Sequence, residues 1–467
     1  MRLYFLSHML YNPTLSRISW STLVLAAGAL FSPVPIVAQT AQTIGTEPVR
    51  DPGNAPTLSL DQAIRLAVEN NYSLSLTREE TGQAVIARQG AVGPFLPSAD
   101  ASVNHSGPLP LHSSVPVTTV GASVSLQVFD GFQDYHAYRR LQTRERQATL
   151  AERGALENLV ESVVVGYYDL VQQKQRLSAI AELLSVSRER ARLAEAKLSV
   201  GAGSKLDQLQ SKADLNEDSS SYLNQELSLE KAKVSLNQLL ARDAAIRFDI
   251  ADSIPLAPAL PLDEWRKGLE QKNASIAAAK ASKIASGYGV DEARGRWLPS
   301  LSTGVSYGAT PAALNSDRAL ATSRDGFGYS VNLSIPLFDR LATPTAVRQA
   351  KAGLRGDEIK LRQAIDQVYA DFEQARRQYE TGLRQISLEE GNLQVARLQA
   401  EAAQERYKLG ASSPLEFRDA QTRLLDAEGR LITARQSAKQ AEAALQRLSG
   451  MLIKQVAEVP PQSGSKQ

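Results

Sequence analysis

The chain has 467 residues, of which 43% are hydrophobic and 22% are charged, so it can bury a core and is not a disordered polymer. Its 52 basic and 50 acidic residues nearly cancel, which gives no support to a nucleic-acid partner. With no cysteine and four histidines it can form neither disulfides nor thiolate sites, and neither a metal nor a cofactor is expected.

The N-terminal segment is predicted to be an export signal. Arginines precede an apolar run over residues 23–38, which is broken by proline and too short to span a bilayer as a helix. We therefore expect a signal peptide over 1–38, with cleavage after Ala38 or Ala41 and with Met9 as a second candidate start. The alternative is a buried apolar segment.

The rest of the chain repeats itself once. The pieces LSLDQAIRLAVENN, FLPS, QVFDG and KLSVGAGSKLD recur in the same order as PLDEWRKGLEQKN, WLPS, PLFDR and YKLGASSPLEF. Phe129 is separated from Gly201 by as many residues as Phe338 is from Gly410. This spacing predicts one structural unit that has been duplicated. The expected domains are 39–254 (first repeat), 255–451 (second repeat) and 452–467 (a flexible tail).

Four segments alternate apolar residues with small polar ones at period two, which is typical of strands with one apolar face. They are 98–106, 117–129, 300–309 and 326–337. The small polar side chains suit a watery lumen and the apolar ones suit lipid, whereas the alternative is an ordinary sheet with one wet face. The residues expected to face lipid are Val124, Leu126, Val305, Tyr307, Phe327, Tyr329, Val331 and Leu333.

Long helices are predicted from three stretches without proline, 117–254, 345–413 and 415–459. Proline breaks helix interiors, and residues such as Leu156, Leu159 and Val163 recur here at helical spacing. A helix of roughly 65 residues spans about 100 Å, so side-by-side packing of the coiled-coil type is expected.

Short turns interrupt these helices at about 199–205 and 408–414. Gly201 and Gly410 mark the ends of the incoming helices, and Ser204 and Ser413 are placed to cap the outgoing ones. Each repeat is therefore expected to contain one antiparallel helical hairpin with its tip at the glycine.

The strands also predict an oligomer. A sheet in lipid cannot leave free edges, because each unpaired backbone group is costly to bury there. One chain supplies four strands, which is fewer than single-chain barrels contain. Copies of the chain must pool their strands, and only twelve strands from a trimer leave a useful pore, since eight are nearly filled by side chains.

These landmarks resemble those of the TolC-like outer-membrane efflux channel family. The matching pieces include LSLDQAIRLAVENNYSL, FLPSADASV, WLPSLSTGVSYG, LQVFDG, SIPLFD and both hairpin turns, and they cover about Leu58 to Leu448. The resemblance implies a mostly α fold with a small β part. It implies a homotrimer with a twelve-stranded β-barrel in the outer membrane, a periplasmic α-barrel of long hairpins, and an equatorial belt drawn from Ile44–Thr57, Ala241–Pro261 and the tail.

The function implied by the resemblance is the exit duct of a tripartite efflux or type I secretion system, fed by an inner-membrane pump through a periplasmic adaptor. An enzyme is not expected, because the sequence has no P-loop, no GxSxG nucleophile elbow between a strand and a helix, and no HExxH or CxxC motif. The competing class is a periplasmic coiled-coil adaptor or scaffold that does not span the membrane. Aromatic residues in or beside the alternating segments, such as Trp297 and Tyr307, favour the membrane interpretation.

The resemblance also places candidate pore residues. Family members close the periplasmic end with acidic rings, and the matching positions hold Glu416 and Asp419. Three copies of each would form two carboxylate rings that favour cations. The alternatives are a capping-box acid after Ser413 for Glu416 and a solvated helix face for Asp419. The first hairpin has Asp207 and Gln210 at the equivalent positions.

Latch and docking residues follow from the same resemblance. Tyr407 matches a tyrosine that latches the closed end, and Asp207 is an expected partner in that latch. The position of the latch arginine holds Ser412, so we expect the closed state to depend on packing more than on ion pairs. The tips are expected to dock the adaptor, although their glycines also serve tight turns. The docking candidates are Leu198, Val200, Gly201, Ala202, Gly203, Leu409, Gly410 and Ala411.

Overall fold

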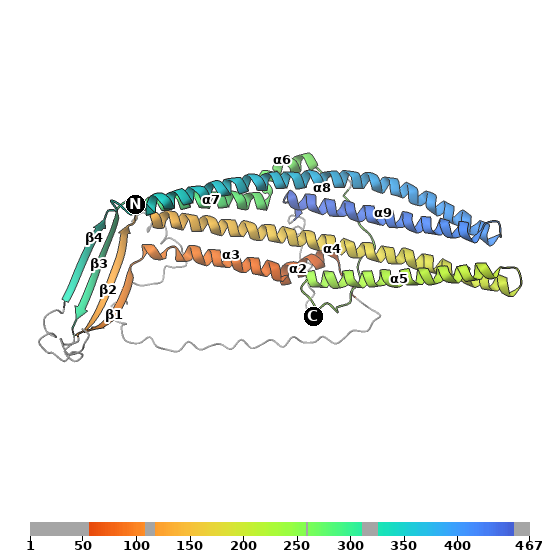
Figure 1. Ribbon diagram of the computed structural model, residues 1–467, viewed down its shortest axis with the longest axis horizontal. Helices are drawn as coiled ribbons and strands as arrows, with labels where there is room; N and C mark the ends of the chain where they lie inside the picture. Colours follow the sequence, from red (N-terminus) through yellow and green to blue (C-terminus); the bar gives the residue numbers. More distant parts are fainter. Residues whose placement is uncertain (1–55, 108–116, 258–259, 311–325, 453–467) are drawn as a thin grey trace, which may run out of the picture. The chain divides into compact units, whose positions relative to one another are not determined.

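The computed structural model describes residues 56–107, 117–257, 260–310 and 326–452 (Figure 1). The predicted signal peptide, most of the predicted belt segment Ile44–Thr57 and nearly all of the predicted tail lie outside these residues. The described residues all belong to one compact unit, Ala55–Gln467.

The fold is mostly helical with one small antiparallel sheet, which confirms the predicted fold class at this level. The helices are α2 (Leu60–Asn70), α3 (Tyr72–Gly90), η2 (Gly93–Phe95), α4 (Gln133–Ser199), α5 (Lys205–Leu239), α6 (Leu262–Lys272), α7 (Ala274–Gly295), α8 (Ala342–Lys408) and α9 (Pro414–Leu448). The strands are β1 (Ser98–Ser106), β2 (Val117–Phe129), β3 (Ser300–Ala309) and β4 (Gly326–Ser334).

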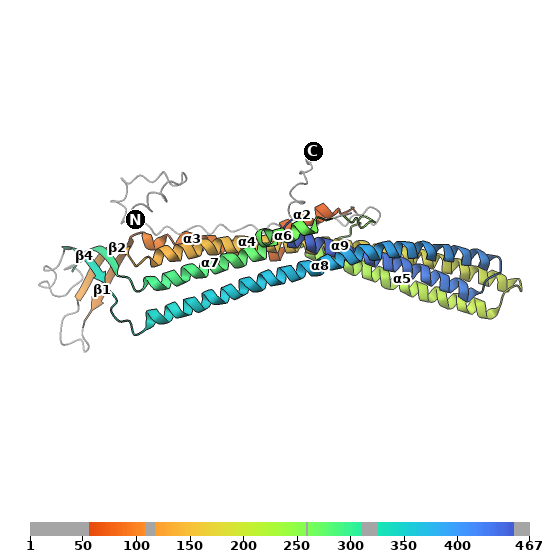
Figure 2. The same cartoon turned by 90° about the horizontal axis from the view of Figure 1, so that it is seen from above.

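The long helices form two hairpins, α4 with α5 and α8 with α9. α4 and α8 have 67 residues each, and α5 and α9 have 35 each. α4 also packs against α7 and α9, and α7 packs against α8, so the two hairpins lie side by side. Both views place the sheet at one end of this unit and the two hairpin tips at the other (Figures 1 and 2).

Two hydrophobic cores lie where the short helices pack on the long ones. The first joins α2, α4 and α5, and the second joins α6, α7, α8 and α9. Their completely buried members include Val163, Leu170, Leu236 and Leu240 in the first core and Leu269, Ile276, Phe372 and Leu445 in the second. No helix in the described part of the chain is both long and apolar enough to cross a membrane.

One asparagine in each half links the start of a helix to the end of another. Asn71 Oδ1 accepts a hydrogen bond from the Leu74 N–H at 3.1 Å, and its Nδ2 donates to the Leu239 carbonyl at 3.0 Å. Asn273, which is 3% exposed, likewise caps α7 and donates to the Leu448 carbonyl at 3.0 Å. Each asparagine thus satisfies backbone groups of two different helices, which no neighbour in the helix could reach.

We expect Asn273→Ala to destabilise the protein by about 1–3 kcal/mol, because it removes a helix cap and leaves a buried carbonyl without its donor. The temperature at which the purified protein loses half of its helical circular dichroism measures this. Asn273→Ser is the matched control, since serine keeps the cap but cannot reach Leu448, and it should lose only part of the stability. An unchanged midpoint for the alanine variant would contradict the role of the link.

The sheet has the order β1-β2-β3-β4, and all its pairs are antiparallel. The register aligns apolar residues across the strands: Val124 pairs with Val305, which pairs with Tyr329. Between them lie rows of glycine and serine on the opposite face, as the alternation predicts. β1 and β4 are the two edges of the described sheet.

The fourth strand is shorter than predicted. It ends at Ser334 rather than at Leu337. Pro336 follows two residues later and has no N–H to donate to a ladder. At the equivalent position, β2 has Gln127, and that strand continues over a bulge to Phe129.

An aspartate lies three residues before each long helix that follows the sheet. Asp130 Oδ2 accepts from the Asp134 N–H at 2.6 Å, and Asp339 Oδ2 accepts from the Thr343 N–H at 2.6 Å. Hydrogen bonds from Thr343 hold the pKa of Asp339 below its ordinary value. Each aspartate thus satisfies a backbone N–H in the first turn of its helix, which the helix itself leaves without a partner.

Candidate functional site

The hairpin tips are tight turns that present apolar side chains to solvent. Gly201 and Gly410 both have φ of +74°, a conformation that glycine adopts without strain. Ser204 and Ser413 cap the outgoing helices, as predicted, by accepting from backbone N–H groups at 3.0 and 3.1 Å. The tip residues are therefore held by local hydrogen bonds while their side chains remain free for a partner.

Most of the predicted docking residues lie on the surface. Leu198 and Gly203 are half-buried, and the other six are exposed, with Leu409 at 82%. The structure adds two residues that sequence reasoning missed, Leu206 and Leu415, which are 64% and 77% exposed. Both occupy the second position of their helix, so the repeat could have revealed them.

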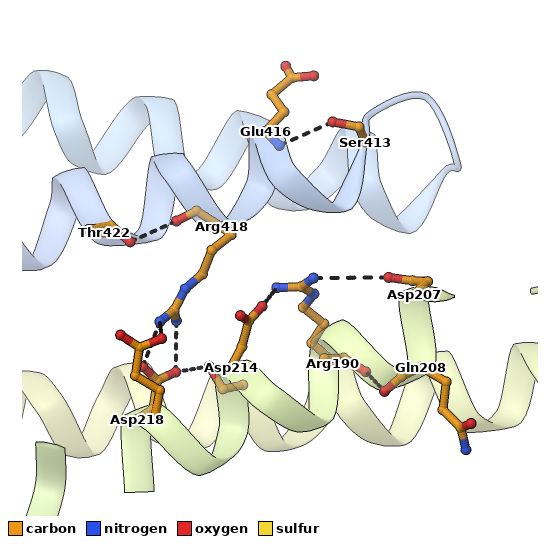
Figure 3. A network of polar contacts seen from close by, with 12 residues as sticks. Arg190, Asp207, Gln208, Asp214, Asp218, Ser413, Glu416, Arg418 and Thr422 are labelled. Carbon is orange, nitrogen blue, oxygen red and sulfur yellow. Dashed lines mark hydrogen bonds and ion pairs between the residues drawn. The ribbon is translucent and has the colours of Figure 1, made fainter. Parts of the chain in front are cut away.

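Buried ion pairs join the two hairpins near the tips (Figure 3). Arg418 on α9 makes two hydrogen bonds of 2.8 Å to the carboxylate of Asp218 on α5. Ser187 on α4 donates to the same carboxylate at 2.5 Å. Asp218 is only 3% exposed, and its hydrogen bonds raise the pKa of Arg418 above its ordinary value. This contact ties three helices together with a bidentate charge pair.

A second buried arginine stands beside the predicted latch. Arg190 on α4 donates to Asp214 at 2.6 Å and lies 4.0 Å from Asp207, both on α5 (Figure 3). Burial raises the pKa of Tyr407, and the negative charge of Asp207 raises it further, so the tyrosine lies next to this pair. The ring of Tyr407 stacks on Phe417 with centroids 5.2 Å apart. Tyr407 and Asp207 are therefore both near Arg190, but no hydrogen bond joins them: among the described residues, the Tyr407 hydroxyl and the Asp207 Oδ1 are buried without a hydrogen-bond partner.

Ser412, the third predicted latch residue, forms no hydrogen bond with Tyr407, Asp207 or Arg190 among the described contacts. Its hydroxyl donates only to the neighbouring Ser413 carbonyl, at 3.3 Å, among the contacts of the described residues. The second tip nevertheless has a guanidinium group, that of Arg406, which donates to the Ala411 carbonyl at 3.3 Å. Sequence reasoning did not single out Arg190, Arg406 or Arg418, since their partners are not marked by any local motif.

Both predicted pore acids have an arginine partner within the chain. The backbone N–H of Glu416 donates to the Ser413 cap, while its carboxylate accepts from Arg406 at 2.8 Å. Asp419 accepts from Arg423 at 2.9 Å, and both side chains of this pair are exposed. The serine half of the predicted capping box is present, and the Glu416 carboxylate is engaged across the turn.

The predicted lipid-facing residues are on the surface of the sheet. Seven of the eight are exposed, and Leu126 is half-buried. Phe327 and Tyr329 on the edge strand β4 are 84% and 87% exposed, and the ring of Tyr307 lies 5.0 Å from that of Phe327. Within the described residues there is no group of three or more His, Asp or Glu side chains that could hold a metal ion.

Comparison with known proteins identifies relatives over most of the chain. A family model described as outer membrane efflux protein matches residues 71–242 and 265–451. Protein CyaE of Bordetella pertussis is 27% identical over 346 residues, which are 70% of this chain and 72% of that protein. Outer membrane efflux protein BepC of Brucella suis is 24% identical over 421 residues, covering 87% and 90%. The structure of the outer-membrane channel OprN superposes with a TM-score of 0.70 at 19% identity, covering 84% of this chain and 89% of that one.

Proposed function

The chain belongs to the outer membrane efflux protein family, and on this premise we propose how its copies assemble and what they conduct. It acts in the outer membrane as an efflux duct. We infer that three copies form one cylinder, the exit duct of a tripartite efflux or type I secretion system. An inner-membrane pump would deliver solutes to it through a periplasmic adaptor. The competing role of a periplasmic scaffold is not favoured by the family assignment.

The observation that carries this proposal is that the outermost strand and helices on one side of the unit differ from those on the other side, and that both sides expose apolar residues. At one edge of the described unit, β1 pairs with β2, and α3 and α5 pack mainly against α4. At the other edge lie β4 and α8. Exposed apolar residues follow both edges: Tyr72, Leu76, Ile86, Leu223, Leu227 and Val234 on one, and Ile359, Leu388, Val395 and Leu398 on the other. Unlike edges that join head to tail close into a ring when the rotation allows it.

A junction inside the chain supports the same assembly. After β2, a side chain on Gly131 would come within 2.2 Å of the Gly295 carbonyl at the end of α7, so the two backbones touch. In the second repeat the equivalent of Gly131 is Arg340, and its neighbours Leu337 and Phe338 are 93% and 78% exposed. In the first repeat, the residue equivalent to Gly295 is Gly93. We propose that Gly93 of the next copy covers the exposed junction of this one.

The proposed junction between copies cannot have the same geometry as the junction inside the chain, because Arg340 has a side chain where Gly131 has none. A Cβ at Gly131 would lie 2.9 Å from the Leu298 Cβ, which is shorter than the roughly 3.5–4.5 Å that a disulfide spans. The junction between copies must be wider to admit arginine. Widening brings Arg340 and Leu96, the equivalent of Leu298, into disulfide range across the interface.

We therefore expect the double variant Arg340→Cys/Leu96→Cys to form a covalent trimer on oxidation, measured as a single high band on a non-reducing denaturing gel. The chain has no cysteine of its own, so the background is clean. Each single variant is the control and should migrate as one chain. A covalent product that stops at two chains, or a ladder that extends beyond three, would contradict the ring.

In the proposed trimer, the candidate site residues would form the constriction and the latch at the periplasmic end. Glu416 and Asp419 remain the candidates for the constriction, but their pairing with Arg406 and Arg423 weakens the negative field that two acidic rings would create. Tyr407 and Asp207 are the candidates for the latch. Arg190 supplies beside them the positive charge that Ser412 lacks.

The exposed residues at each end of the unit indicate what each end of the duct contacts. The apolar face of the sheet is proposed to meet outer-membrane lipid, and the opposite face of glycine and serine is proposed to meet water. The exposed apolar side chains at the tips, with Leu206 and Leu415 added to the predicted set, are proposed to receive the adaptor.

A further inference from the structure

A cavity of about 320 Å³ lies between the two hairpins, where α4, α8 and α9 meet. Apolar side chains, among them Leu183, Val186, Phe417 and Leu424, form much of its wall. Its size is at the lower end of the range for small-molecule pockets, and an apolar wall with a few convergent polar groups is their usual make-up.

The charged groups of the cavity are mainly acidic. Glu182, Glu401 and Glu428 contribute to its lining, and Arg397 is the one basic residue there. Arg397 lies 3.7 Å from Glu428, whereas neither Glu182 nor Glu401 forms an ion pair with another described residue. Burial raises the pKa of Glu428, and the negative charge of Glu182 raises it further. Glu182 and Glu401 are exposed, whereas Glu428 is half-buried. The lining of the cavity therefore carries more negative than positive charge, which favours a cation.

An unsatisfied amide in the same wall is a second, independent observation. Gln421 on α9 lines the cavity and is 6% exposed. Neither its Oε1 nor its Nε2 has a hydrogen-bond partner among the described residues. Buried polar groups are almost always partnered, so the Oε1 acceptor calls for a donor that the described chain does not provide.

We propose that this cavity binds a small amphipathic organic cation with one ammonium group and one aromatic ring. The ring packs among Leu183, Val186 and Phe417, and the ammonium group lies toward Glu182 and Glu428 with a hydrogen bond to the Gln421 Oε1. Because the cavity is lined by both hairpins of one chain, the site does not depend on the proposed trimer or on the duct.

The test uses the purified full chain in detergent, titrated by calorimetry with 2-phenylethylammonium and with its neutral analogue 2-phenylethanol. The cation should bind saturably, and the alcohol at least about tenfold more weakly. Glu182→Gln/Glu428→Gln should weaken the cation by about tenfold or more and leave the alcohol unchanged. Gln421→Leu should weaken both compounds, since it removes the shared hydrogen-bond acceptor.

Glu189→Gln is the matched control, because Glu189 is an exposed acid on α4 that pairs with Arg192 and does not line the cavity. It should bind both compounds as the unchanged protein does. Three results would overturn the proposal: no saturable binding of the cation, equal affinity for cation and alcohol, or the same loss from Glu189→Gln as from the double glutamine variant. Circular dichroism of each variant confirms that the hairpins are folded.

Discussion

Replacing Arg418 with alanine should loosen the contact between the two hairpins by about 3–5 kcal/mol, because it leaves the buried carboxylate of Asp218 without its counter-charge. Asp218 is 3% exposed, and Ser187 would be its one remaining partner among the described side chains. A hydroxyl donor cannot replace a bidentate guanidinium, so the ends of α5 and α9 should separate more often.

Hydrogen exchange of amides near the tips measures this opening. In Arg418→Ala, amides of α9 around residue 418 should exchange about 100-fold faster or more, while those near the sheet stay unchanged. Arg423→Ala is the matched control: this arginine is five residues further along the same helix, and its pair with Asp419 is exposed. It should change stability by no more than about 0.5 kcal/mol.

The double variant Arg418→Met/Asp218→Leu separates the cost of an unpaired charge from the loss of the contact. Apolar side chains of similar size leave no buried charge, so exchange should return close to that of the unchanged protein. If Arg418→Ala alone exchanged like the unchanged protein, the ion pair would not hold the hairpins together.

The long helices and their tips could be predicted because their signals are local. Glycine at the helix end and serine at the next helix start act within one turn, and the structure has both glycines at φ of +74° and both serine caps. The end of β4 was predicted wrongly for a similar local reason. The alternation of apolar residues continues to Leu337, but Pro336 cannot donate to a ladder.

The buried charges near the tips could not be predicted, because their partners are far apart in the chain. Arg418 and Asp218 are 200 residues apart and belong to different hairpins. On its own, each has the appearance of a solvated residue on a polar helix face. The side chain of Glu416 had two predicted roles, a pore ring and a capping box, and the structure shows a third contact, with Arg406 across the turn.

Gly201→Arg and Gly410→Arg should each abolish efflux while trimers still form. Nothing lies within 4 Å of a side chain built on either glycine, so the arginine would project from the tip without disturbing the hairpin core. It would stand beside the exposed Val200 or Leu409, where the proposed adaptor would approach closely. A long charged side chain there blocks that approach and places an unpaired charge in an apolar contact.

The left-handed turn itself needs a control, because any side chain at φ of +74° is strained. Gly201→Asn and Gly410→Asn provide it, since asparagine tolerates this conformation and adds only a short polar group. Growth in the presence of exported toxic compounds, in the native host lacking its own copy, should be lost with arginine and kept with asparagine. Retained growth with both arginine variants would contradict docking at the tips. Equal loss with asparagine would assign the effect to the shape of the turn.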